Sequence, residues 1–171
     1  EVRIVDRWSL TGGSGLVKVL VVRGRAGIVN RLVIPLFQET RRFDARLGID
    51  SDLLRMADRA VKEKVFKGRA GETLLLLPPA HGGVGSLVLL GLGPEKKCTL
   101  ETLRRAVGSL SRRSRREGSG DAGLALGAPH LAEKLQALGW EAAVKAVTIA
   151  WVLGSYAFDT FKTEPAHKKR P

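Results

Sequence analysis

Apolar residues recur along this chain in short runs that alternate between strand-like and helix-like spacing. The runs that predict strands are residues 2–5, 16–22, 31–37, 74–77, 87–91 and 122–126. The runs 74–77 and 87–91 are continuously apolar, so we expect both strands to be central and covered on both faces. Pro35 cannot donate a ladder hydrogen bond, which places the run 31–37 at a sheet edge or a bulge.

Three segments show the spacing of amphipathic helices. The first covers residues 52–65, with Ser51 as its expected N-cap and an inward face made by Leu53, Leu54, Ala57 and Ala60. The second follows Thr99, another N-cap residue, and carries an apolar stripe of Leu100, Leu103, Val107 and Leu110. Because helices alternate with strands, we predict a three-layer α/β domain with a mixed sheet.

The third helix lies in the longest apolar-periodic segment, residues 141–163. Gly154-Ser155 interrupts this segment, and an aromatic cluster follows the interruption. The aromatic residues of the segment are Trp151, Tyr156, Phe158 and Phe161. So much aromatic surface must be buried against something, and we expect Trp151 to be mainly core, with Phe158 or Phe161 nearer to a surface that another part of the protein covers.

Composition narrows the class of protein. The chain has 171 residues, of which 44% are hydrophobic, enough for a core of its own. No apolar run approaches the roughly 18 residues of a membrane span, so we expect no membrane partner. Cys98 is the single cysteine, which rules out an internal disulfide and leaves a reduced cytoplasmic setting as the simplest expectation.

The formal net charge of +12 makes nucleic acid a candidate partner, since counterion release favours contacts with phosphates. Six of the positive charges fall on the polar side of the second helix. They are Arg104, Arg105, Arg112, Arg113, Arg115 and Arg116. This side is either a solvated outer face or a surface that faces DNA, RNA or an acidic neighbouring subunit.

Candidate catalytic and metal-binding residues are not evident. The acidic residues are scattered among Lys and Arg, whereas two neighbouring divalent ions need several convergent carboxylates. His81, His130 and His167 show no ligand spacing. We therefore assign no catalytic residue, metal ligand or cofactor to this chain.

Two glycine-rich stretches could be taken for phosphate loops. Residues 81–86 lie between two predicted strands, which indicates a hairpin loop. Gly91-Leu-Gly93 follows a strand and precedes a helix, but the third glycine of a dinucleotide-binding motif is missing. A nucleotide site at the strand ends stays open as an alternative.

Several short motifs occur in an order that resembles one known family. They are Pro-Leu-Phe at 35–37, Phe-Lys-Gly-x-x-Gly-Glu-Thr at 66–73, Val-Leu-Leu-Gly-Leu-Gly at 88–93, Thr-Leu-Glu-x-Leu-Arg-Arg-Ala at 99–106 and Leu-Gly-Ser-Tyr-x-Phe-Asp-x-Phe-Lys-Thr at 153–163. This ordered set resembles the N-terminal domain of the leucyl aminopeptidases, the two-metal cytosol aminopeptidases. The resemblance implies a macro-like α/β domain at residues 1–140, a linking helix at 141–163 and a polar tail at 164–171.

The resemblance also implies what this chain does not do by itself. In that family a second domain supplies a Lys and several acidic ligands to two divalent ions, zinc or manganese, and its Gly-Lys-Gly-x-x-Phe-Asp-x-Gly-Gly and Asn-Thr-Asp-Ala-Glu-Gly-Arg motifs do not occur here. We therefore expect a non-catalytic domain whose partners are the catalytic domain of the same polypeptide and other copies in a homo-oligomer, a hexamer by resemblance. A nucleic-acid-binding module that uses the basic helix, and a free-standing macro-like nucleotide binder, are the alternatives.

Overall fold

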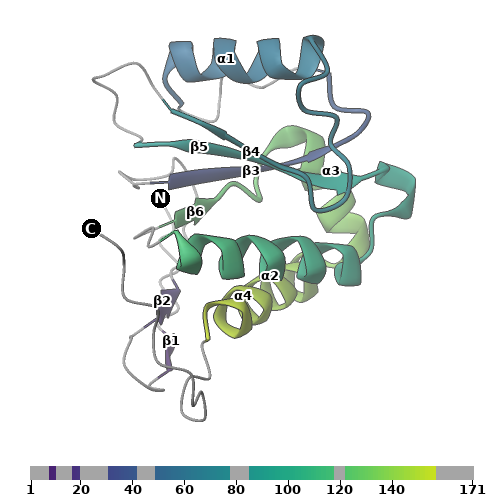
Figure 1. The fold of residues 1–171 in the computed structure, drawn as a ribbon. Helices are drawn as coiled ribbons and strands as arrows, with labels where there is room; N and C mark the ends of the chain where they lie inside the picture. The colour runs from purple at the N-terminus through teal and green to yellow at the C-terminus, as the bar shows by residue number, and fades with distance from the viewer. Residues whose placement is uncertain are drawn as a thin grey trace, which may run out of the picture.

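Strand β3, Arg31–Phe37, lies inside the four-stranded sheet that organises the fold (Figure 1). The computed structural model describes residues 8–10, 17–19, 31–41, 49–77, 85–117 and 122–156. The strand order is β4-β5-β3-β6. β5 (Leu87–Gly93) and β6 (Ala122–Leu124) run parallel to β3, whereas β4 (Thr73–Leu76) runs antiparallel to β5. The sheet is mixed, as the sequence predicts.

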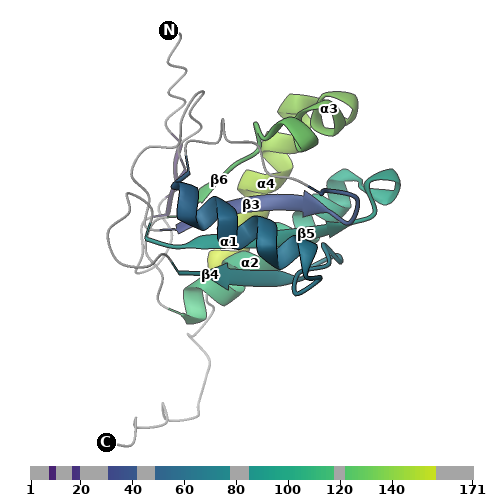
Figure 2. The ribbon, with the colours of Figure 1, turned by 90° about the horizontal axis from the view of Figure 1, so that it is seen from above.

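Helices cover both faces of this sheet (Figures 1 and 2). α1 (Ser51–Lys62) covers one face, and α2 (Leu100–Arg116), α3 (Pro129–Leu138) and α4 (Trp140–Ser155) lie on the other. Because side chains alternate along a strand, β3 feeds two cores. Leu32, Ile34 and Leu36 enter the core beneath α1, while Val33 and Phe37 enter the core beneath α2, α3 and α4. The predicted three-layer α/β architecture is confirmed.

The two apolar strands differ in burial. Every residue of β5 is buried, in agreement with the prediction. β4 instead forms an edge of the sheet, and Leu75 is 42% exposed. The prediction of a second central strand is therefore wrong, because continuous apolar sequence does not by itself reveal whether a second neighbour is present. The antiparallel pairing of β4 with β5 confirms the predicted hairpin; residues 78–84 of its loop lie outside the described residues.

Pro35 lies within β3 without breaking the sheet, because β6 is short. β6 pairs only with Arg31–Val33, and the Ala125 amide donates to the Val33 carbonyl at 2.9 Å. Backbone groups of alternate residues point to the same side of a strand, so the nitrogen of Pro35 faces the region that β6 does not reach. The prediction that β3 is an edge strand is wrong, because β5 and β6 flank it. The predicted bulge corresponds to the register shift between Leu36 and Phe37.

Side chains cap the first two helices. The Asp50 carboxylate accepts from the Asp52 amide at 2.8 Å, so the N-cap of α1 is Asp50 and not the predicted Ser51. Thr99 caps α2 as predicted and forms a reciprocal capping box with Thr102. A one-residue error of this kind is expected where two capping residues are adjacent.

α3 is not among the predicted helices, although the sequence holds signals for it. Pro129 occupies its first turn, and Gly139 ends it with a φ of 85°. The chain bends there by 102° between α3 and α4. In the part of the chain that the structure describes, no single helix is long and apolar enough to cross a membrane, although this bent pair passes the same test of length and composition when taken together.

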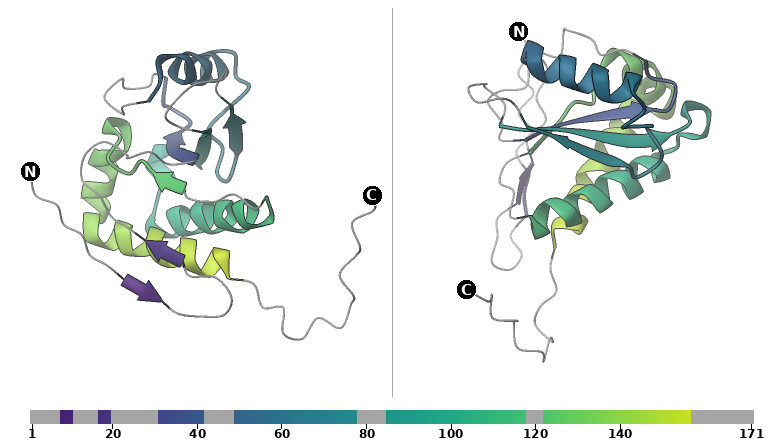
Figure 3. Two further views of the ribbon diagram at one scale, coloured as in Figure 1. Left: turned by 90° about the vertical axis from the view of Figure 1, so that its left-hand side faces the viewer. Right: turned by 45° about the horizontal axis from the view of Figure 1, so that its top comes forward.

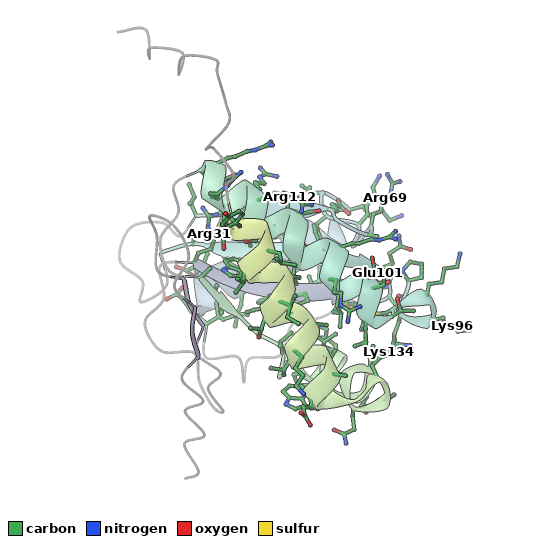
Figure 4. The ribbon with its side chains drawn as sticks, turned by 90° about the horizontal axis from the view of Figure 1, so that it is seen from below. Arg31, Arg69, Lys96, Glu101, Arg112 and Lys134 are labelled. Atoms are coloured by element: carbon green, nitrogen blue, oxygen red, sulfur yellow. The ribbon has the colours of Figure 1, made fainter. Side chains whose placement is uncertain are left out.

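α2 and α4 pack closely through small residues (Figure 4). A Cβ added at Gly154 would lie 2.7 Å from the Gly108 carbonyl oxygen, so the two backbones nearly touch. The Ser111 hydroxyl donates to the Trp151 carbonyl at 2.7 Å. α4 ends at Ser155, at the Gly154-Ser155 interruption of the apolar run, so the helix is shorter than the linking helix predicted over 141–163; residues 157–163 lie outside the described residues.

A second, two-stranded sheet lies beside α4 (Figure 3). β1 (Trp8–Leu10) pairs antiparallel with β2 (Val17–Val19). We expected the strand at 16–22 to begin the edge of the main sheet, but among the described residues β2 pairs with β1 alone. The predicted strand at 2–5 lies outside the described residues.

Candidate interaction surfaces

The six arginines of α2 are all exposed, on the side opposite its buried stripe. Acidic residues of the same helix and its cap neutralise three of them. Glu101 accepts from Arg105 Nε at 2.8 Å and lies 3.7 Å from Arg104 Nη1. Glu117 accepts from Arg113 Nε at 2.8 Å. Half of the predicted basic face is therefore an ordinary ladder of surface ion pairs.

The other three arginines, Arg112, Arg115 and Arg116, have no carboxylate partner among the described residues. Arg112, labelled in Figure 4, donates to the Ser109 hydroxyl at 3.0 Å. Arg115 donates to the Tyr156 carbonyl at 3.2 Å. Neither contact neutralises the positive charge. The partial negative charge at the helix C-terminus offsets part of this charge. A compact group of three cations therefore marks the last two turns of α2.

Glu117 also holds the end of α2 to the start of β3. Its carboxylate accepts from Arg31 Nη1 at 3.0 Å, and the Arg31 side chain is only 12% exposed. The hydrogen bond from Arg113, helped by Arg31, lowers the pKa of the Glu117 carboxyl below its ordinary value. Arg113 further donates to the Thr73 hydroxyl of β4 at 2.7 Å. These contacts connect three elements, so Arg113 has a structural role that its exposure alone does not suggest.

The last turns of α4 present an apolar surface. We call Ile149, Leu153 and Tyr156 the α4 patch; they are 53%, 70% and 56% exposed. Trp151 lies partly buried against the core beneath the sheet, whereas Phe158 and Phe161 lie outside the described residues. Sequence periodicity identified the aromatic residues but missed Ile149 and Leu153, because both continue an apolar run that reads as core.

The loop at residues 66–72 fills the carboxyl end of β5. The Glu72 carboxylate accepts from the amides of Lys67 and Arg69, at 3.1 and 2.9 Å. The loop backbone then bonds to β5, with the Gly93 amide donating to the Gly68 carbonyl at 2.8 Å. A Cβ added at Gly91 would lie 2.0 Å from the Arg69 carbonyl oxygen. Gly91 therefore makes room for the protein's own loop, and phosphate would find no space at this strand end.

Groups that bind metals or act as nucleophiles are sparse. No cluster of three or more His, Cys, Asp or Glu residues that could hold a metal ion occurs among the described residues. His130 Nε2 donates to the Pro35 carbonyl at 2.8 Å, while His81 and His167 lie outside the described residues. Cys98 is buried, and this burial raises the pKa of its thiol.

Comparison with known proteins gives a consistent result. A model of the cytosol aminopeptidase family, N-terminal domain, matches residues 33–165. The chain is 30% identical over 142 residues to a probable cytosol aminopeptidase of Halorhodospira halophila, and 28% identical over 146 residues to one of Clostridium perfringens. These alignments cover 82% and 85% of this chain but 27% of each relative.

Two solved structures share the fold. A tomato leucine aminopeptidase matches with a TM-score of 0.60 and 19% identity, over 84% of this chain and 29% of that chain. The macrodomain of Thermus aquaticus DarG matches with a TM-score of 0.53 and 13% identity, over 75% of this chain and 88% of that chain. At these identities the matches show the fold alone, and they confirm the predicted macro-like α/β domain.

Proposed function

Because this chain belongs to the cytosol aminopeptidase family, of which it is an N-terminal domain, we propose that it serves a longer aminopeptidase as a non-catalytic domain. The longer polypeptide releases N-terminal amino acids with the help of two divalent ions, zinc or manganese, bound by its other domain. The described residues of this chain offer no group that fits such ions. The role of the N-terminal domain is to dock on the catalytic domain and to shape access to active sites in a homo-oligomer, a hexamer by family resemblance.

The observation that carries this proposal is the α4 patch. Exposed apolar side chains that lie together on one helix face indicate a surface that a partner covers. The relatives extend well beyond the aligned 27%, and the matching family model describes an N-terminal domain. The partner that covers the α4 patch is therefore the catalytic domain of the same polypeptide, which the residues after Tyr156 connect to this domain. Phe158 and Phe161 belong to this proposed contact, and Trp151 supports it from the core side.

A first experiment tests whether catalysis requires the other domain. The purified 171-residue chain should not release leucine from a chromogenic amide, with or without added zinc or manganese, whereas the longer gene product should. Metal-dependent turnover by the 171-residue chain would refute the proposal. Light scattering of the longer product measures the expected hexamer.

A second experiment tests the docking surface with Leu153→Ser. In the isolated chain Leu153 is 70% exposed, so its replacement should change the free energy of unfolding by less than about 0.5 kcal/mol. In the longer polypeptide the same change should cost about 1.5 to 3 kcal/mol, because it removes a Leu side chain that the catalytic domain buries. Val65→Ser is the matched control, since Val65 is 60% exposed on the connection that follows α1. Equal decreases of stability in both contexts would show that the catalytic domain does not cover the α4 patch.

A second candidate function is nucleic-acid binding through α2. The observation in its favour is the group formed by Arg112, Arg115 and Arg116, whose charges no described carboxylate neutralises. Cationic side chains that contact phosphates release counterions, which gives binding its steep dependence on salt. The ion-paired arginines at the start of α2 contribute less, because Glu101 already neutralises part of their charge.

Fluorescence anisotropy with duplex DNA at several salt concentrations tests this function. Changing Arg112, Arg115 and Arg116 to Gln should reduce the slope of log affinity against log salt by about one unit for each phosphate that the protein no longer binds. The control variant changes Arg104 and Arg105 to Gln. An unchanged slope in the triple variant would leave these arginines as a solvated helix face.

A further inference from the structure

A cavity of about 180 Å³ opens at the carboxyl end of β3, between the end of α1 and the turn at residues 38–41. Its floor is formed by the apolar side chains of Leu36, Val61 and Phe66, which belong to the core beneath α1. The carboxyl ends of parallel strands are where α/β sheets usually bind ligands. Loop 66–72 packs on this end of β5 and also approaches the backbone of Phe37, and its residues Phe66, Lys67 and Gly68 line the cavity.

Three cationic side chains, Arg41, Lys64 and Lys67, line the cavity, and no acidic residue does. All three residues are exposed, and none forms an ion pair with another described residue. Glu72 accepts from the backbone amide of Lys67, but it is not a lining residue. The cavity therefore combines an apolar floor with a rim of uncompensated positive charge.

The backbone at Lys64 adds a second, independent observation. Lys64 has a φ of 57°, and it is the single described non-glycine residue with a positive φ. It follows the C-cap of α1, where its amide donates to the Val61 carbonyl at 3.2 Å, a position that glycine usually occupies. A side chain there costs free energy that glycine would not. In return, Lys64 places its charge at the cavity.

We propose that this cavity binds a small organic anion. Its apolar part rests on the floor formed by Leu36, Val61 and Phe66, and its carboxylate or phosphate group meets the three cations of the rim. The volume is below the roughly 300 Å³ of the smallest pockets for drug-sized ligands, which favours an anion the size of benzoate over a nucleotide. This binding site is separate from the α4 patch and does not depend on the proposed docking role.

Titration of the isotope-labelled 171-residue chain by amide NMR tests the site with three probes. Benzoate and phenyl phosphate should shift the amides of Gln38, Thr40 and Gly68, which line the cavity, with dissociation constants on the order of 1 to 10 mM for ligands of this size. Benzamide, a neutral analogue of benzoate, should bind at least about threefold more weakly. Tighter binding of phenyl phosphate identifies a phosphate monoester as the ligand class, and tighter binding of benzoate identifies a carboxylate.

The variant pair Lys64→Gly with Lys67→Gln removes two rim charges. It should weaken benzoate binding about fivefold to twentyfold while the thermal midpoint stays at or above that of the parent chain, because glycine accepts the positive φ at position 64. The control pair Lys96→Gln with Lys97→Gln removes the same charge from exposed positions outside the cavity and should leave binding nearly unchanged. Equal weakening by both pairs, equal binding of benzamide, or shifts centred outside the cavity would overturn the proposal.

Discussion

Two glycines that face each other across the α2–α4 contact should respond in opposite ways to alanine. We expect Gly154→Ala to destabilise the protein and Gly108→Ala to stabilise it. A Cβ at Gly154 would lie 2.7 Å from the Gly108 carbonyl oxygen and 2.7 Å from Ser111 Cβ. A Cβ at Gly108 would meet the Ala150 carbonyl oxygen at 3.6 Å, an ordinary van der Waals distance.

The magnitudes follow from these distances. Replacing glycine by alanine within a helix stabilises it by about 0.5 to 1 kcal/mol, and by less in a last turn such as that of Gly154. The overlap at Gly154 involves a backbone oxygen, so α4 must move away from α2, and overpacking of this kind costs about 1 to 3 kcal/mol. The same movement weakens the hydrogen bond from Ser111 to the Trp151 carbonyl, which contributes about 1 kcal/mol. The net loss of stability at Gly154 should be about 1 to 3 kcal/mol, against a gain of about 0.5 to 1 kcal/mol at Gly108.

Urea denaturation of the two single variants and the parent chain measures both changes, provided that the slope of free energy against urea stays constant. A Gly154→Ala variant as stable as the parent would mean that the helices separate at no cost, which would refute close packing as the basis of this contact. Destabilisation by Gly108→Ala of the same size would show that the distances do not predict the response at this interface.

Three further results are expected. Glu117→Gln should lower stability by about 0.5 to 1 kcal/mol at pH 7, a modest loss because the carboxylate is partly exposed. Since Arg113 depresses the pKa of Glu117 in the folded protein, the contribution of the carboxylate is complete above its ordinary pKa and disappears as pH falls through the folded-state pKa. The denaturation midpoints of parent and variant should therefore differ at neutral pH and converge only below the folded-state pKa. Cys98 should react with a thiol reagent only as the protein unfolds, because the thiol is buried and its pKa is raised; rapid reaction in native buffer would contradict this. Trp151→Ala should cost about 2 to 4 kcal/mol in denaturant melts of the isolated chain, as its side chain packs partly buried on the core, and Phe161→Ala much less; equal losses of stability would place Phe161 in the core as well.

Local sequence patterns were sufficient to predict the layer architecture and most of the helix–strand pattern. The apolar run at 87–91 predicted a central strand correctly, because burial on both faces demands apolar residues at every position. The run 31–37 was recognised as a strand but was wrongly placed at an edge. Thr99 and the stripe from Leu103 to Leu110 fixed α2, since capping and helical periodicity are local properties of sequence. The ordered motifs likewise identified the family. One of them, residues 66–73, contains the loop whose backbone bonds closely to β5.

Long-range contacts determine which apolar and charged residues are left over for function. Leu75 and Leu153 look like core residues in the sequence, and they are exposed because β4 has no outer neighbour among the described strands and α4 turns one side away from α2. The six arginines of α2 look alike until their partners are known, and only the fold separates Arg112, Arg115 and Arg116 from those that Glu101 and Glu117 neutralise. The cavity at the end of β3 brings together residues from two segments of the chain, 36–41 and 61–68, a proximity that no local pattern encodes. Capping and periodicity in the local sequence determine the helices and strands. Which surfaces stay exposed to bind partners depends on contacts between residues far apart in the sequence.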